Sequence, residues 1–222
     1  ASDEFATLSE EQQKVIENAV RDFTLSGVAL PAEQKKRFAE IQAKLSELSS
    51  TFSNNVMDAT MGWTKHITDE AELAGMPESA LEAAAQAAHQ KDLQGWLFTL
   101  DIPSYLPVML YADNRELREE MYRAYATKAS DQGPNAGKWD NTDIIKETLT
   151  LRTELAELLG FSSYAERSLA TKMADSTDQV IGFLRDLAAK SKPQAEKELE
   201  EVRAYAKDKH GVSELAAWDL PY

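Results

Sequence analysis

The strongest periodic pattern in the chain is FAEIQAKLSELSSTFSNNVMDA, residues 38–59. Its apolar side chains recur at spacings of three and four residues, which places them on one narrow face of a helix. We expect this helix to run from about residue 31 to residue 61 and to be roughly 45 Å long. A seam of this kind needs partner helices, so the stretch predicts a mainly α fold, an elongated multi-helix bundle. The residues of the seam are Phe38, Ile41, Leu45, Leu48, Phe52, Val56 and Ala59.

Helix-start signals flank this stretch on both sides. Ser9, Ser163 and Ser176 are each followed three residues later by Glu or Gln, which is the pattern of a capping box. Asn114 and Thr142 are expected to begin two further helices. Pro193 is expected to break or restart the last helix. The apolar side chains that these patterns turn inward are Val15, Ile16, Ala19, Val20, Phe23, Leu117, Met121, Ala124, Tyr125, Ile145, Leu149, Leu155, Leu158, Leu159, Val180, Ile181, Leu184, Leu187, Leu199, Val202 and Tyr205.

Two short segments have the pattern of strands. Residues 63–68 and 95–100 alternate and carry β-branched or aromatic side chains, so we expect a minor pair of short β-strands. An Ala-rich helix from residue 77 to about 90 lies between them. Pro103 and Pro107 are expected to flank a short apolar turn or helix over residues 104–112.

The composition narrows the class of partner. The chain has 222 residues, a formal charge of −14 and no Cys. The absence of Cys excludes disulfides and thiolate-bound metals. The negative charge repels phosphate backbones and anionic lipids, so we expect no nucleic acid and no membrane as partner. No run of 18 apolar residues occurs, and a soluble protein is predicted.

Histidine offers no metal motif. His66, His89 and His210 are far apart, and none belongs to H-E-x-x-H, the spacing that sets two imidazoles around zinc on one helix face. Surface or capping roles are predicted for all three. His210 stands at a helix end, where a cation suits the helix dipole. No zinc site is encoded in these residues.

Other candidate sites also have simpler interpretations. The loop Gly133–Lys138 differs from a phosphate-binding loop, because it has three residues between its glycines and Trp139 in place of Ser or Thr. It also lacks the Gly and Glu of a calcium loop. A structural loop is predicted, with the edge of a binding cleft as the alternative. Aromatic residues at helical spacing are expected in the core, with a peptide groove as the alternative, and a run of glutamates is expected on a solvated helix face. These residues are Tyr105, Tyr111, Tyr122, Tyr125, Trp96 and Glu196, Glu198, Glu200, Glu201.

The end of the sequence is unusually apolar. Residues 217–222 read AWDLPY, whereas terminal segments tend to be polar. We expect these aromatic side chains either to dock back onto the chain or to pack against something that follows in a larger protein. From the chemistry of the residues alone, the chain is a helical protein with no visible active site.

Several long stretches resemble one known family. They are FSNNVMDATMGWTKHITDEAELAGMPESAL (52–81), LDIPSYLPVM (100–109), LREEMYRAY (117–125), ASDQGPNAGKWDN (129–141) and LATKMA (169–174). The chain is similar over essentially its whole length to the thimet oligopeptidase family of zinc metallopeptidases. The resemblance implies a mostly helical, two-lobed parent with a deep channel that admits short unstructured peptides. In that family a His-Glu-x-x-His helix and a further Glu hold the zinc, and the Glu of the motif activates a water.

This sequence contains no residue that matches a zinc ligand or the catalytic base. We therefore expect residues 1–222 to be a helical segment of the non-catalytic lobe and part of a channel wall, with zinc only in the cytoplasmic parent enzyme. The segment alone is expected to be inactive, and its substrate-binding residues stay unknown. Because truncation exposes apolar surface, self-association is expected. The alternatives are a non-enzymatic module whose seam docks a partner helix, and an acidic peptide-binding protein.

Overall fold

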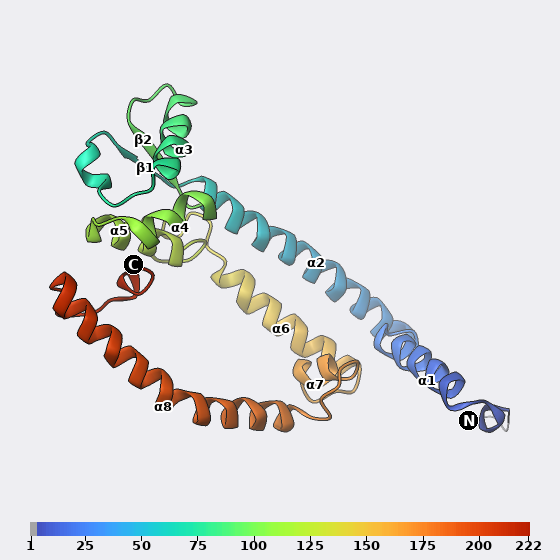
Figure 1. The fold of residues 1–222 in the computed structure, drawn as a ribbon. Coiled ribbons are helices and arrows are strands. Elements are labelled where there is room, and N and C mark those ends of the chain that lie inside the picture. Colours follow the sequence, from blue (N-terminus) through green and yellow to red (C-terminus); the bar gives the residue numbers. More distant parts are fainter. Residues whose placement is uncertain (1–3) are drawn as a thin grey trace. The chain divides into compact units, whose positions relative to one another are not determined.

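A computed structural model describes residues 4–222 of the chain and has the expected mainly α fold with one pair of short strands (Figure 1). Short 3₁₀ turns lie at Phe5–Thr7, Glu70–Leu73 and Ala217–Asp219. The helices are α1 (Glu10–Leu25), α2 (Ala32–Met61), α3 (Glu78–His89), α4 (Ile102–Tyr111), α5 (Arg115–Ala126), α6 (Thr142–Leu158), α7 (Tyr164–Leu169) and α8 (Thr177–His210), and the strands are β1 (Thr64–Ile67) and β2 (Trp96–Thr99).

These elements belong to two compact units. The first contains the residues up to Ser49 together with Ile144–Arg185. The second contains Ser50–Asp143 together with Asp186–Tyr222. Three helices, α2, α6 and α8, contribute residues to both units. No helix of the described residues combines the length and apolarity needed to cross a bilayer.

The core of the first unit confirms that the seam of α2 packs against a partner helix, which is α6. Phe38, Ile41 and Leu48 of α2 are buried against α6. Arg37 of α2 donates from Nε and Nη2 to the two carboxylate oxygens of Glu154, at 2.5 and 2.7 Å. That paired guanidinium lowers the pKa of the Glu154 carboxyl. The α6 side chains in this core are Ile144, Leu151, Leu155 and Leu158.

The expected inner face of α6 is partly wrong. Leu155 is buried as expected, but Ile145 and Leu149 are 47% and 58% exposed. Successive residues of an α-helix differ by about 100° in direction. The face that contains Ile144 and Leu151 therefore turns Ile145 away from the core, and the two adjacent isoleucines made this choice ambiguous in the sequence.

Helix α1 begins and ends as its sequence signals indicate, but its apolar face is not covered by the described residues. Ser9 accepts from the backbone of Gln12, and the Gln12 side chain accepts from the backbone of Ser9. Gly27 adopts φ 77°, the left-handed conformation that ends a helix. The helix nevertheless buries no residue. Its expected inner side chains are exposed instead: Val15 67%, Ile16 41%, Val20 59% and Phe23 64%.

Helix α8 corrects two expectations. It runs without a break through Pro193. Proline removes only its own hydrogen bond to the carbonyl of Ala189, and that position is exposed, so water can take the place of the missing donor. The side chains expected on its inner face are largely exposed: Ile181 45%, Leu184 51%, Leu187 52%, Val202 42% and Tyr205 60%.

The second unit is built around the strand pair and the helices that follow it. Strands β1 and β2 pair antiparallel, with Thr64 opposite Thr99 and Ile67 opposite Trp96, as the alternation predicted. Figure 1 shows α3 beside these strands, with α4 and α5 close by. The core between these elements contains Ile67, Leu73, Ala84, Phe98, Leu100, Val108, Met109, Leu117, Met121 and Ala124.

Both prolines lie inside α4 rather than at its flanks. Pro103 occupies the first turn, where the helix requires no backbone N–H donor. Pro107 lies in the helix interior, where one hydrogen bond is lost. The α4 side chains Val108 and Met109 are 0% and 1% exposed, and we attribute the retention of the helix to this burial.

The loop after α5 is anchored at its end by Asn141. The amide of Asn141, 2% exposed, donates to the carbonyl of Phe52 at 3.2 Å and accepts from Asn55 at 2.8 Å. Its backbone N–H also donates to the carbonyl of Ala129 at 3.0 Å. The two side-chain bonds tie the end of the loop to α2, and the backbone bond ties it to the start of the loop. Phe52 itself is 38% exposed, so the buried seam of α2 is less continuous than expected.

Candidate functional site

The three histidines have separate local environments. His66 makes a 2.6 Å hydrogen bond to the carbonyl of Gln94, and His89 lies in the last turn of α3. His210 lies in the last turn of α8, and its ring is near those of Tyr205 and Tyr222. Within residues 4–222, no group of three or more His, Cys, Asp or Glu side chains is arranged to hold a metal ion. The described residues therefore do not fit a zinc centre.

The aromatic candidates are mainly core side chains. Trp96, Tyr105, Tyr122 and Tyr125 pack, partly buried, against the core of the second unit. The rings of Tyr105 and Tyr125 stack with their centroids 4.2 Å apart, and burial raises the pKa of Tyr105. Tyr111 differs, since it is 49% exposed.

The glutamate run of α8 lies on a solvated face, as predicted. Glu196, Glu198, Glu200 and Glu201 are all exposed. Three of them pair with Lys or Arg side chains of the same helix. Glu198 instead accepts from Gln194 at 2.8 Å.

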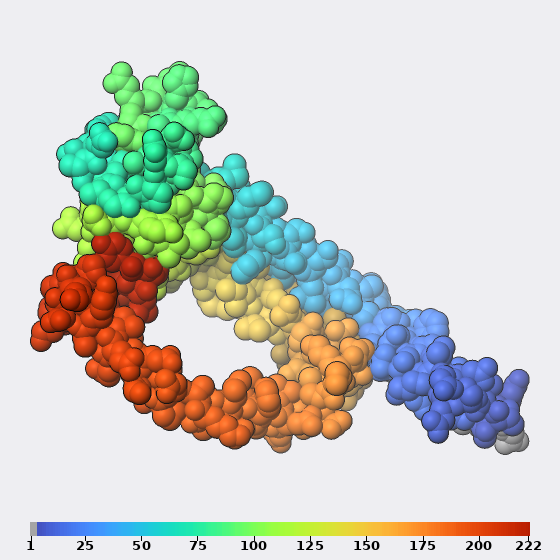
Figure 2. Space-filling model, in the orientation of Figure 1, coloured from blue at the N-terminus to red at the C-terminus, as the bar shows by residue number. Residues whose placement is uncertain are grey.

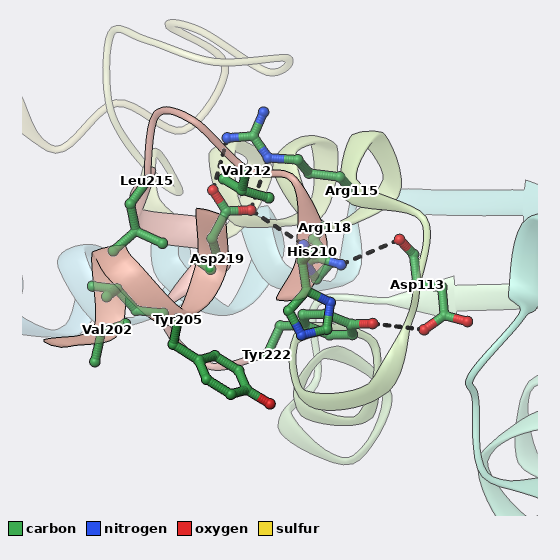
Figure 3. A pocket seen from close by; sticks show the side chains of 12 residues that line it. Asp113, Arg115, Arg118, Val202, Tyr205, His210, Val212, Leu215, Asp219 and Tyr222 are labelled. Carbon is green, nitrogen blue, oxygen red and sulfur yellow. Dashed lines mark hydrogen bonds and ion pairs between the residues drawn. The ribbon is translucent and has the colours of Figure 1, made fainter. Parts of the chain in front are cut away.

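A pocket of about 240 Å³ lies within the second unit, between α5, the end of α8 and the C-terminal segment, residues 211–222. Figure 2 shows this segment, in dark red, against the atoms of the α5 region. Figure 3 shows the side chains that converge on the pocket. The lining residues are Asp113, Arg115, Arg118, Val202, Tyr205, Ala206, His210, Val212, Leu215, Asp219, Leu220 and Tyr222.

The polar centre of the pocket is Asp219, whose side chain is only 4% exposed. Arg115 donates to both of its carboxylate oxygens, from Nε at 2.8 Å and from Nη2 at 2.7 Å. Arg118 donates from Nη2 to Oδ1 at 3.1 Å, and the backbone N–H of Ala216 donates to Oδ2 at 2.9 Å. The bonds from Arg115, followed by those from Ala216 and Arg118, lower the pKa of Asp219 from 3.8 to about 2 against the opposing effect of burial.

Arg118 also binds the backbone at both sides of the pocket. Its side chain is 3% exposed, and Nη1 donates to the carbonyl of Ala112 at 2.6 Å. Its Nε donates to the carbonyl of Trp218 at 3.2 Å. A buried guanidinium is stable only when its donors are paired, and here they pair with two segments that lie about a hundred residues apart. Arg118 thereby fastens the C-terminal segment to α5.

Aromatic side chains complete the attachment. The guanidinium of Arg118 lies 4.0 Å from the centroid of the Tyr222 ring. The Tyr222 hydroxyl donates to Asp113 Oδ1 at 2.7 Å, and this bond raises the pKa of Tyr222. Trp218 packs 5.9 Å from the ring of Tyr122. Of the two alternatives left open for the terminal aromatic residues, the structure shows the first: Trp218 and Tyr222 contact the chain itself.

We call Arg115, Arg118 and Asp219 the clamp, because their ion pairs hold the C-terminal segment against α5. Its buried charges already pair with one another, and the Arg115 side chain, 43% exposed, is the charged group of the clamp that solvent reaches most. Arg115, Arg118 and Asp219 were not among the residues predicted from the sequence. One available signal was Arg118 itself, a charged residue among the apolar positions of the inner face of α5. Its partner lies 101 residues away and carries no motif.

The chain matches known proteins over its whole length. The model of Peptidase family M3 matches residues 108–222. The chain is 63% identical over 220 residues to Oligopeptidase A of Escherichia coli K12, covering 99% of the chain and 32% of that relative. It is 62% identical over 221 residues to Oligopeptidase A of Haemophilus influenzae, with 100% and 32% covered. Probable cytosolic oligopeptidase A of Arabidopsis thaliana is 43% identical over 231 residues, with the same coverages.

These matches confirm the resemblance found in the sequence. The chain spans about a third of the length of these curated relatives, which are covered to 32%. The family model extends over more than half of the 222 residues, including α5, α8 and the clamp. The chain belongs to Peptidase family M3.

Proposed function

We propose that the chain is a non-catalytic helical part of a zinc-dependent oligopeptidase that hydrolyses short unstructured peptides in a channel. The observation that carries this proposal is the 63% identity to a protein named Oligopeptidase A over 99% of the chain. More distant relatives also carry peptidase names: Dipeptidyl carboxypeptidase of E. coli is 28% identical over 216 residues.

In this proposal the zinc site lies in the rest of the parent, and this chain has a structural role. The sequence has no H-E-x-x-H, and His66 and His210 have other local partners. Zinc would supply a polarised water elsewhere in the parent. The chain supplies helices of the non-catalytic lobe and part of the channel wall, and by itself it does not cleave peptides.

The cytosolic location is also a proposal. The name of one Arabidopsis relative includes the word cytosolic. Another Arabidopsis relative, 41% identical over 231 residues, is named as chloroplastic and mitochondrial. Cell fractionation of the source organism, followed by detection of the chain with an antibody, distinguishes the two locations.

A segment exchange tests the enzymatic proposal. In E. coli Oligopeptidase A, the matched 220 residues are replaced by this chain, and hydrolysis of quenched fluorescent peptides is measured with and without a zinc chelator. We expect chelator-sensitive hydrolysis by the chimera and none by the isolated chain. A folded chimera without activity, or chelator-sensitive cleavage by the isolated chain, would overturn the proposal.

A non-enzymatic interaction or peptide-binding module is the second candidate. The exposed apolar face of α1 favours it, since such a face is typical of a binding surface. Isothermal titration of the isolated chain with basic peptides separates the two candidates. Micromolar binding together with an inactive chimera would support the module, whereas an active chimera supports the enzyme.

A further inference from the structure

Helix α1 combines a strong amphipathic pattern with a complete lack of burial. Val15, Ile16, Val20 and Phe23 lie at spacings that form one apolar stripe, and each is at least 41% exposed. No residue of the helix is buried. Isolated helices of about this length are marginally stable in water, and most helix stability in proteins comes from packing of the apolar face. The capping box at Ser9 stabilises only the first turn.

The stripe forms one wall of a groove. Phe5 and Leu8, from the segment before α1, line a groove of about 850 Å³ together with Ile16 and Val20 of the stripe. Glu4 and Glu17 place two negative charges, and Arg21 one positive charge, beside this apolar surface. A groove of this kind fits the apolar ridge of an amphipathic helix, whose side chains at i, i+3 or i+4, and i+7 enter it.

The charges of α1 argue against a membrane as the occupant. Helices that lie on anionic lipid carry Lys and Arg on their polar face. Helix α1 has four acidic residues and two basic ones, in a chain with a net charge of −14. Its first turn contains Glu10 and Glu11, which an anionic surface would repel.

We infer that the groove of α1 is the docking site for an amphipathic helix from the part of the parent polypeptide that lies outside this chain. This inference rests on the proposed function. The match to the E. coli relative covers 99% of this chain but only 32% of the relative, so about two thirds of a parent of that length is available to cover the stripe. A second copy of the chain is the competing occupant, and the experiment below distinguishes the two.

Hydrogen exchange of α1 tests the inference in the same chimera, independently of peptide hydrolysis. Mass spectrometry follows exchange of residues 10–25 in the isolated chain and in the chimera. We expect exchange at least about tenfold slower in the chimera, because docking adds a free-energy cost to opening the helix. Light scattering of the isolated chain is measured in parallel.

Matched variants identify the face responsible. The double substitution Ile16→Gln and Val20→Gln replaces the two apolar side chains of the stripe that line the groove, without adding charge, and we expect it to abolish the extra protection. Lys14→Gln introduces the same side chain at an exposed position on the opposite face and should leave the protection unchanged. All of these variants should have the same thermal midpoint in the isolated chain, because the altered side chains are exposed there.

Several results would overturn the inference. Equal exchange of α1 in the isolated chain and the chimera would exclude docking. A dimer of the isolated chain with protected α1 would make a second copy the occupant. An active chimera with unprotected α1 would refute the docking alone, and an inactive chimera with protected α1 would refute the enzymatic proposal alone. A chimera that does not fold would count against both.

Discussion

Removing the carboxylate of Asp219 is expected to destabilise the second unit by about 3 kcal/mol. The substitution Asp219→Ala leaves the guanidinium of Arg118, 3% exposed, without its charged partner. Breaking a buried ion pair by removing one member typically costs about 3–5 kcal/mol. The lower end applies here because Arg118 keeps its bonds to the carbonyls of Ala112 and Trp218.

The lowered pKa of Asp219 provides a second route to the magnitude. A pKa lowered from 3.8 to about 2 corresponds to about 2 kcal/mol of preference for the ionised form in the folded protein. Because the pKa is lowered on folding, this contribution is present above pH 3.8 and is lost as the pH falls towards 2. The stability difference between the wild type and Asp219→Ala should therefore shrink in that range.

Tryptophan fluorescence isolates this effect. All four tryptophans, at positions 63, 96, 139 and 218, belong to the second unit, so fluorescence during urea unfolding reports on that unit. Asp186→Ala is the matched control, because Asp186 belongs to the same unit and pairs with Lys190 at 60% exposure. Asp186→Ala should lower the free energy of unfolding by less than about 0.5 kcal/mol. If Asp219→Ala costs no more than Asp186→Ala, the clamp does not hold the C-terminal segment as described.

Three further predictions concern the backbone, the first unit and the terminal tyrosine. Gly95→Ala should lower the free energy of unfolding, measured in urea, by more than Gly137→Ala does. Both glycines have positive φ, but a Cβ at Gly95 would lie 2.3 Å from the carbonyl oxygen of Ile67, whereas a Cβ at Gly137 would have no atom within 4 Å. Equal costs would contradict this close contact. Leu155 is 1% exposed, so Leu155→Ala should lower the free energy of unfolding by about 3 kcal/mol, as is typical of buried leucines. Leu149 is 58% exposed, so Leu149→Ala should lower it by less than about 0.5 kcal/mol. Circular dichroism measures both, and equal losses would refute the assigned face of α6. Tyr222→Phe should remove one late step from the alkaline ultraviolet titration of the tyrosines, because the bond to Asp113 raises the pKa of Tyr222. Stability from this bond is present below the usual pKa of 10 and is lost as the pH rises further; an unchanged titration would refute the bond.

The fold was predictable wherever local signals agreed with each other. The seam of residues 38–59, the alternation in residues 63–68 and 95–100, and the capping box at Ser9 all correspond to elements of the structure. Proline was the misleading signal, because a single lost hydrogen bond does not end a helix whose other interactions persist. Both Pro107 and Pro193 lie inside helices.

The candidate site was predictable only in part. The apolar ending at residues 217–222 indicated that these aromatics would dock on something. The partner surface was not predictable, because Arg115 and Arg118 meet Asp219 across more than a hundred residues of chain. A lone Asp near the end of a sequence has no pattern that distinguishes it from a solvated one.

The amino-acid order by itself determined the capped helix starts, the strand pair and the membership of a peptidase family, because these depend on local periodicity, capping chemistry and long shared motifs. It did not determine the continuity of α8 through Pro193. Only the tertiary structure decided which apolar stripes are buried and which carboxylate is held between two guanidiniums. Periodicity shows that a helix has an apolar face, but burial depends on whether another element reaches that face. For α1 no described element does, and for Asp219 the enclosing side chains arrive from a distant helix.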